Sequence, residues 1–107
     1  MDLISFSFHP SIPQDHYSQW VQATLRQLNK DFALAGISFQ LKELDSPENA
    51  MKVLTDWLRD ASPVEINSLI YILDIHHHSV HLKPEDMAVA ILKRAFSKVW
   101  LRHRMKH

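Results

Sequence analysis

The feature that most constrains the fold is a set of apolar residues spaced three or four positions apart, behind serine and proline residues. In the first such stretch, Ser11 and Gln14 have the spacing of a capping box, in which both side chains satisfy free amides at a helix start. The apolar positions that follow lie on one face of a helix of about six turns; they are Tyr17, Trp20, Val21, Thr24, Leu25, Leu28, Phe32 and Ala35. This helix should end at Gly36, the only glycine in the chain, because glycine suits the left-handed stop of a helix.

Two short segments beside that helix alternate between apolar and polar residues instead. They are residues 4–8, with Ile4, Phe6 and Phe8, and residues 37–42, with Ile37, Phe39 and Leu41. Alternation of β-branched and aromatic residues predicts half-buried strands, and the order strand, helix, strand permits a parallel crossover. Two strands alone form a marginal sheet. Either a partner chain extends the sheet across a dimer, or both segments lie as extended covers on the helices.

Three further helices are predicted in the second half of the chain. Asp45 or Ser46 caps the first of them, Ser62 opens a capping box before the second, and Pro84 begins the last. The middle helix is apolar nearly all round, so we expect it to be the central one; its apolar residues are Ile66, Leu69, Ile70, Tyr71, Ile72, Leu73 and Ile75. A buried strand over residues 69–75 is the alternative, because periodicity alone does not separate the two.

Composition narrows the class of protein. A chain of 107 residues without cysteine has no disulfide, thiolate zinc site, iron–sulfur cluster or cysteine nucleophile. Its strictly apolar runs, among them residues 69–73 and 87–92, are too short to cross a bilayer, and no signal-peptide pattern is visible, so a cytoplasmic location is expected. We therefore predict one domain over residues 1–107, with a predominantly helical α+β fold in the order β-α-β-α-α-α.

Charge is distributed unevenly along the chain, although twelve Lys and Arg balance twelve Asp and Glu. Residues 1–92 hold all twelve acids and six of the cations, whereas residues 93–107 hold six cations and no acid. On a helix, four of those cations lie four residues apart and form a slowly drifting row, here called the cationic stripe: Arg94, Lys98, Arg102 and Lys106. This stripe is the candidate surface for binding a partner or phosphates.

The cationic stripe fits more than one role. It suits an acidic protein face or the phosphates of a nucleic acid, and cations at a helix end also stabilise the helix dipole without any partner. Pairing with acids of the same chain is a further alternative. Residues 60–82 contain no Lys or Arg, which argues against a helix-turn-helix recognition helix. A membrane partner is not expected, because the core needs Phe96 and Trp100 on the same helix.

A histidine cluster at residues 76–81 is the second candidate site. If the helix continues, Asp74, His77, His78 and His81 share one face, and imidazoles four residues apart bind divalent ions such as Zn²⁺ or Ni²⁺. The comparison with metalloprotease HExxH helices fails, because position 78 is histidine where that chemistry needs glutamate. The alternatives are a polar helix end and, with eight histidines in the chain, a pH-sensitive oligomer.

No nucleophile elbow, glycine-rich phosphate loop or paired carboxylates stand out, so no catalytic residue, cofactor or small-molecule substrate is predicted, and the chain is not expected to be an enzyme. We expect a small non-catalytic protein-interaction or regulatory module that forms a homodimer and contacts its partner through the cationic stripe. Two other functions stay open. One is a nucleic-acid-associated protein that uses the same stripe, and the other is a divalent-metal-binding protein centred on His77, His78 and His81.

Overall fold

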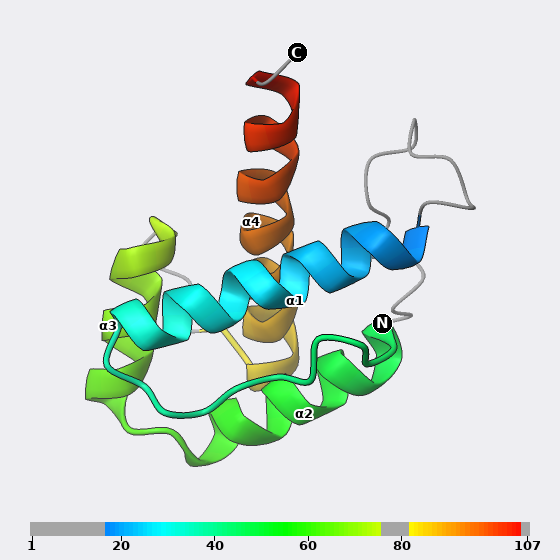
Figure 1. Ribbon diagram of the computed structural model, residues 1–107. Coiled ribbons are helices and arrows are strands. Elements are labelled where there is room, and N and C mark those ends of the chain that lie inside the picture. The colour runs from blue at the N-terminus through cyan, green and yellow to red at the C-terminus, as the bar shows by residue number, and fades with distance from the viewer. Residues whose placement is uncertain (1–16, 76–81, 106–107) are drawn as a thin grey trace.

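The computed structural model describes residues 17–75 and 82–105, and these residues fold into four helices (Figure 1). The helices are α1 (Tyr17–Leu34), α2 (Pro47–Asp60), α3 (Pro63–Leu73) and α4 (Pro84–Met105). Within the described ranges there is no strand, so the predicted α+β fold with two strands is wrong and the architecture is all-helical. The first predicted strand, residues 4–8, and the capping box at Ser11 lie outside the described residues.

Helix α4 is the centre of the fold. It packs against α1, α2 and α3, and α1 crosses it near its middle (Figure 1). The apolar side of α4 is buried along its first half, over Met87, Ala88, Ile91, Leu92 and Ala95. The same core cluster contains the fully buried side chains of Leu28 and Phe32 from α1 and Leu54 from α2.

Helix α3 is a peripheral helix, so the expectation that it would be central is wrong. Leu69, Ile70 and Leu73 face the core, but Val64 is 74% exposed and Tyr71 is 80% exposed. The number of neighbouring elements decides how much of a helix is buried, and α3 has fewer close neighbours than α4. The apolar residues all round α3 therefore mark a face without a neighbour in the described part of the chain.

The segment predicted as a second strand, residues 37–42, covers the helices as an extended chain. Ile37 and Leu41 are buried while Ser38 and Gln40 are exposed, as the alternation predicts. Phe39 stacks on Trp57 of α2 with ring centroids 5.3 Å apart. The inference of alternating burial is therefore confirmed, and the inference of a sheet is wrong because the segment lies on helices.

Asn29 of α1 supplies the hydrogen bonds that a neighbouring strand would otherwise provide. Its side-chain amide donates to the Leu41 carbonyl at 2.8 Å, and its side-chain oxygen accepts from the Leu41 backbone N–H, also at 2.8 Å. This reciprocal pair satisfies both backbone groups of a buried residue, which would be costly to leave unpaired. One side chain thus replaces a strand partner.

The helix ends follow the predicted chemistry closely. Ser46 caps α2 and accepts from the Asn49 backbone N–H, and Ser62 and Glu65 form the complete capping box of α3. Gly36 has a φ of +76°, in the left-handed region that glycine tolerates, two residues after Leu34, where α1 ends. Local sequence signals at these termini are confirmed.

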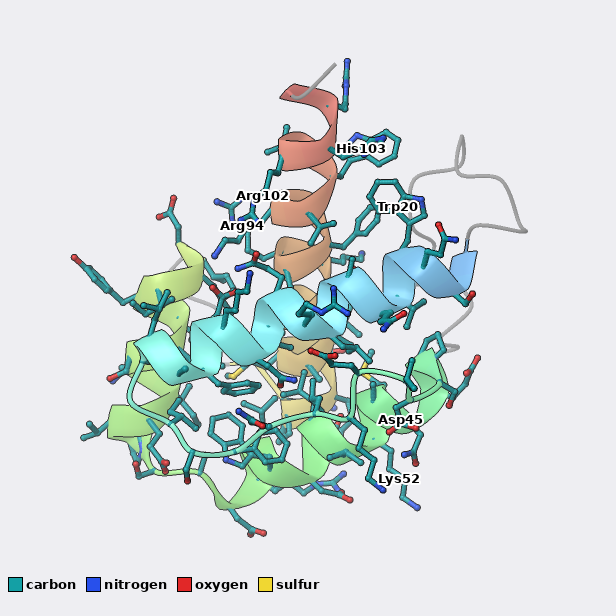
Figure 2. All side chains as sticks on the ribbon, in the orientation of Figure 1. Trp20, Asp45, Lys52, Arg94, Arg102 and His103 are labelled. Atoms are coloured by element: carbon teal, nitrogen blue, oxygen red, sulfur yellow. The ribbon has the colours of Figure 1, made fainter. Side chains whose placement is uncertain are left out.

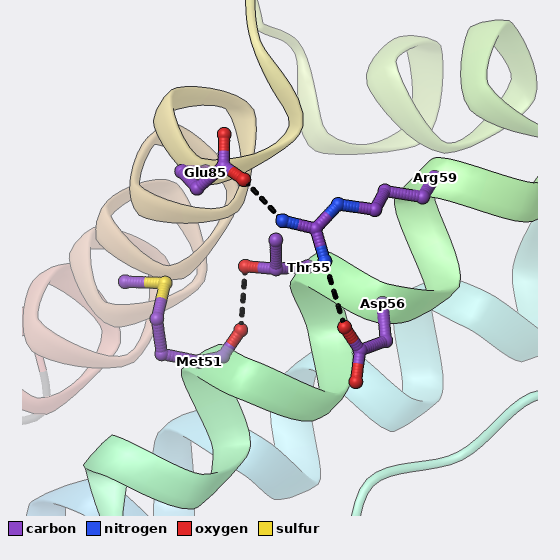
Figure 3. Close-up of polar contacts among 5 residues, drawn as sticks. All are labelled: Met51, Thr55, Asp56, Arg59 and Glu85. Carbon is purple, nitrogen blue, oxygen red and sulfur yellow. Dashed lines mark hydrogen bonds and ion pairs between the residues drawn. The ribbon is translucent and has the colours of Figure 1, made fainter.

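Arg59 joins α2 to the start of α4 (Figure 3). Its guanidinium donates to the carboxylate of Asp56 on its own helix and to that of Glu85 in the first turn of α4. The backbone N–H of Glu85 and then the Arg59 guanidinium stabilise the Glu85 carboxylate and hold its pKa below the ordinary value. On the next turn towards the start of α2, the Thr55 hydroxyl donates to the Met51 carbonyl, which keeps this buried threonine satisfied.

Replacing Asn29 should destabilise the protein because it removes the two bonds to Leu41. We expect Asn29→Ala to lower the free energy of unfolding by about 1–3 kcal/mol, since both backbone groups of Leu41 lose their partner. Asn29→Asp keeps the acceptor and loses the donor, so its effect should be intermediate. Lys30→Ala, at the neighbouring exposed position of the same helix, is the matched control and should change stability by less than about 0.5 kcal/mol. Urea unfolding measures all three, and equal effects of Asn29→Ala and Lys30→Ala would contradict this role.

The tie between α2 and α4 should depend on pH. A carboxylate with a lowered pKa in the folded state stabilises the fold fully above the ordinary glutamate value, about 4.3. That contribution is lost as the pH falls through the folded-state pKa. We therefore expect Glu85→Gln to lower the melting temperature near neutral pH and to have no effect on it in strong acid. A melting difference that stays constant down to strong acid would show that Glu85 acts by some other route.

Candidate functional site

Three members of the cationic stripe, Arg94, Lys98 and Arg102, lie on α4, which continues as a helix to Met105; Figure 2 labels Arg94 and Arg102. The second half of α4 runs past α1 (Figure 1). Trp20 of α1 packs there against Trp100 and His103, with ring centroids 5.2 and 5.0 Å away. These aromatic contacts hold the helix in place one turn before it ends.

Arg94 is engaged by the end of α3. Its Nε donates to the carbonyl oxygen of Leu73, the last residue of α3, at 2.7 Å. Its Nη2 lies 4.0 Å from the carboxylate of Asp74, and the arginine side chain is 34% exposed. A cation at a helix C-terminus satisfies free carbonyls and the negative end of the dipole, so this member of the stripe ties α3 to α4.

Lys98 is engaged by a buried carboxylate of α1. Its Nζ lies 2.8 Å from Oδ1 of Asp31, a residue with no exposed surface, and the Gln27 side-chain amide donates to the same oxygen at 3.1 Å. A carboxylate out of contact with water is costly unless it is paired, and Lys98 is the cation that pairs with it. The second member of the stripe is thus part of the α1–α4 interface.

The remaining members of the stripe differ. Arg102 is exposed, and Lys106 lies outside the described residues. Arg104, which was not part of the stripe, is also exposed. Within residues 17–75 and 82–104, no aspartate or glutamate forms an ion pair with Arg102 or Arg104.

We call residues 101–104 the α4 tip. Leu101 is 51% exposed there, between the core-facing Trp100 and the exposed Arg102. At about 100° per residue, Arg102 and Arg104 point to nearly opposite sides of the helix. The α4 tip therefore presents cations around its circumference with an apolar side chain between them, and not a single row.

The predicted metal site cannot be placed on the structure. His77, His78 and His81 lie outside the described residues. Among the residues that are described, no group of three or more histidine, aspartate or glutamate side chains is arranged to hold a metal ion. In the same part of the chain, no helix has the length and apolar character needed to cross a membrane.

A second surface feature was missed by the sequence analysis. A shallow groove of about 370 Å³ lies between the end of α1 and the outer side of α3; its lining residues are Leu34, Ala35, Asn67, Ser68, Tyr71 and Ile72. Residues 32–41 carry no charge, and residues 61–73 carry only Glu65. That absence of charge, in a chain otherwise rich in charged residues, was the available signal.

Replacing Lys98 should lower the free energy of unfolding more than replacing Asp31, its partner in the buried ion pair. Lys98→Met leaves Asp31 buried without its cation, so we expect a loss of about 3–5 kcal/mol in the free energy of unfolding. Lys98 is 23% exposed, so in Asp31→Leu its ammonium can reach water and the loss should be smaller. The double variant Asp31→Leu/Lys98→Met should be more stable than Lys98→Met alone. Lys93→Met, at an exposed position on the same helix, is the control, and a Lys98→Met effect no larger than the control would contradict the pairing.

Comparisons with protein-family models, with curated proteins and with solved structures find no match to this chain.

Proposed function

We propose that the protein is a small non-catalytic interaction module in the cytoplasm that binds an acidic surface of a partner protein through the α4 tip and acts as a homodimer. The observation that carries this proposal is the exposure of Leu101, Arg102 and Arg104 together at the end of a helix that is anchored by Trp20. Residues 93–107 contain no aspartate or glutamate that could pair with Arg102 or Arg104 in place of a partner's carboxylates.

The internal use of Arg94 and Lys98 favours a protein partner over a nucleic acid. A helix that follows a phosphate backbone needs several cations on one side, and two of the four stripe cations already have partners in α1 and α3. Arg102 and Arg104 diverge around the helix, with half-exposed Leu101 between them. A mixed apolar and cationic end of this kind suits a pocket with an acidic rim, because the leucine fills the pocket while the arginines meet carboxylates.

The test compares two labelled probes, a poly-glutamate peptide and a random-sequence DNA duplex, in titrations at low and high salt. We expect the peptide to bind wild type at low salt and Arg102→Glu/Arg104→Glu to lose about tenfold or more in affinity, since each reversal turns an attraction into a repulsion. Lys42→Glu/Lys52→Glu is the matched control, with the same change of charge at two exposed lysines; Figure 2 shows Lys52 far from the α4 tip. The control variant carries the same change of net charge as Arg102→Glu/Arg104→Glu, and its affinity for the peptide should stay close to that of wild type.

Two results would contradict the proposal. One is equal loss of peptide affinity in both charge-reversal variants, which would show an effect of net charge only. The other is tighter binding of the duplex than of the peptide, with a log–log salt slope of about −1.8 or steeper, as expected when two or more phosphates are neutralised. That outcome would support the nucleic-acid alternative.

A further inference from the structure

The strongest unexplained feature outside the α4 tip is a set of exposed apolar side chains on one side of the molecule. Leu34 at the end of α1 is 72% exposed, and Tyr71 on α3 is 80% exposed. Val64, about two turns before Tyr71 on the same face of α3, is 74% exposed. Large apolar residues gathered in this way are uncommon on monomers and mark interaction surfaces.

We propose that the groove between the end of α1 and α3 is the surface through which two copies of this chain associate. The inference rests on the homodimer in the proposed function and names its interface. It assigns self-association to a part of the molecule different from the α4 tip, so the dimer and the acidic partner use separate surfaces.

The shape of the groove fits pairing with itself. Ala35, Ser68 and Ile72 are half-buried and form the lower part, whereas Leu34 and Tyr71 stand out beside them. A two-fold interface joins the same patch on both subunits, so the patch must hold both a protrusion and a hollow. In such a pair, Tyr71 or Leu34 of each copy enters the groove of the other.

The absence of charged side chains from the groove favours a second copy over a highly charged partner as its occupant. The groove is lined by uncharged residues, and the flanking stretches 32–41 and 61–73 together carry one charge, Glu65. Two identical faces with a strong charge would repel each other, but two neutral apolar faces gain from burial without that cost. A highly charged partner would find nothing complementary here.

Polar groups at the groove are suited to a self-complementary contact. Asn67, Ser68 and Tyr71 bring an amide, a hydroxyl and a phenol to the groove, and the structure gives none of these three side chains a hydrogen-bond partner within the described residues. Each can both donate and accept, so the same residue can pair with its own copy across a two-fold axis. Tyrosine also contributes a large contact area at interfaces.

The test measures molar mass by light scattering and sedimentation over a wide range of protein concentration, at low and high salt. We expect wild type to reach twice the 12.5 kDa chain mass and to keep it in high salt, because apolar association is not screened. Leu34→Glu and Tyr71→Glu should each weaken the dimer by about tenfold or more, since burying a carboxylate in the groove is unfavourable. Both positions are exposed, so the variants should keep the helical circular dichroism of wild type; two variants are made so that one remains if the other unfolds.

Two controls locate the interface. Leu44→Glu makes the same change at a leucine that is 85% exposed, one residue before Asp45, which Figure 2 shows at the opposite side of the molecule from α3. It should remain dimeric. Arg102→Glu/Arg104→Glu should also remain dimeric, because the α4 tip is not part of this contact.

Each other result overturns a different claim. A wild-type monomer at all concentrations overturns both the dimer and its interface. This result includes the case in which another segment of the chain or a different protein occupies the groove. It leaves the proposal of acidic-partner binding at the α4 tip unaffected. A dimer that survives both Leu34→Glu and Tyr71→Glu places the interface elsewhere. A dimer that dissociates in high salt, or in Arg102→Glu/Arg104→Glu, assigns self-association to charges at the α4 tip and overturns the role of the groove.

Discussion

The buried ion pair between Asp31 and Lys98 is the interaction on which the arrangement of α1 and α4 depends. Asp31 has no exposed surface and its Oδ1 receives both Lys98 and Gln27. Such a pair adds little net stability, but any other register of the two helices would leave a buried carboxylate without its cation, which is strongly unfavourable. The pair therefore selects one register, and in that register Trp20 contacts the α4 helix near its end.

This register also divides the cations of α4 into two groups. Arg94 and Lys98 hold the helix to α3 and α1, whereas Arg102 and Arg104 remain exposed at the α4 tip. The uncharged groove between α1 and α3 involves neither group. A dimer through the groove and a partner at the α4 tip are therefore compatible, because each uses residues that the other leaves exposed.

Local signals in the sequence predicted the helix ends well, and tertiary contacts explain the errors. Ser46, Ser62 and Gly36 act through their own neighbours in the chain, so their roles are visible without a structure. The alternation of residues 37–42 indicates burial on one side, and an extended cover on helices satisfies this pattern as well as a sheet does. The bonds from Asn29 to Leu41 join positions twelve residues apart and have no sequence pattern. Likewise, the spacing of the cationic stripe predicted that its members share a helix face. It did not predict that Asp31 pairs with Lys98 or that Asp74 lies near Arg94.

The arrangement on which both proposed surfaces depend is one continuous α4 helix whose inner cations hold it to α3 and α1 and whose outer cations stay exposed. Nuclear magnetic resonance tests it directly, through backbone carbon shifts of residues 97–104 and exchange of lysine ammonium protons with water. We predict helical shifts through Arg104 and markedly slower exchange at Lys98 than at exposed Lys93. Random-coil shifts beyond Ser97, or equally fast exchange at Lys98 and Lys93, would contradict it.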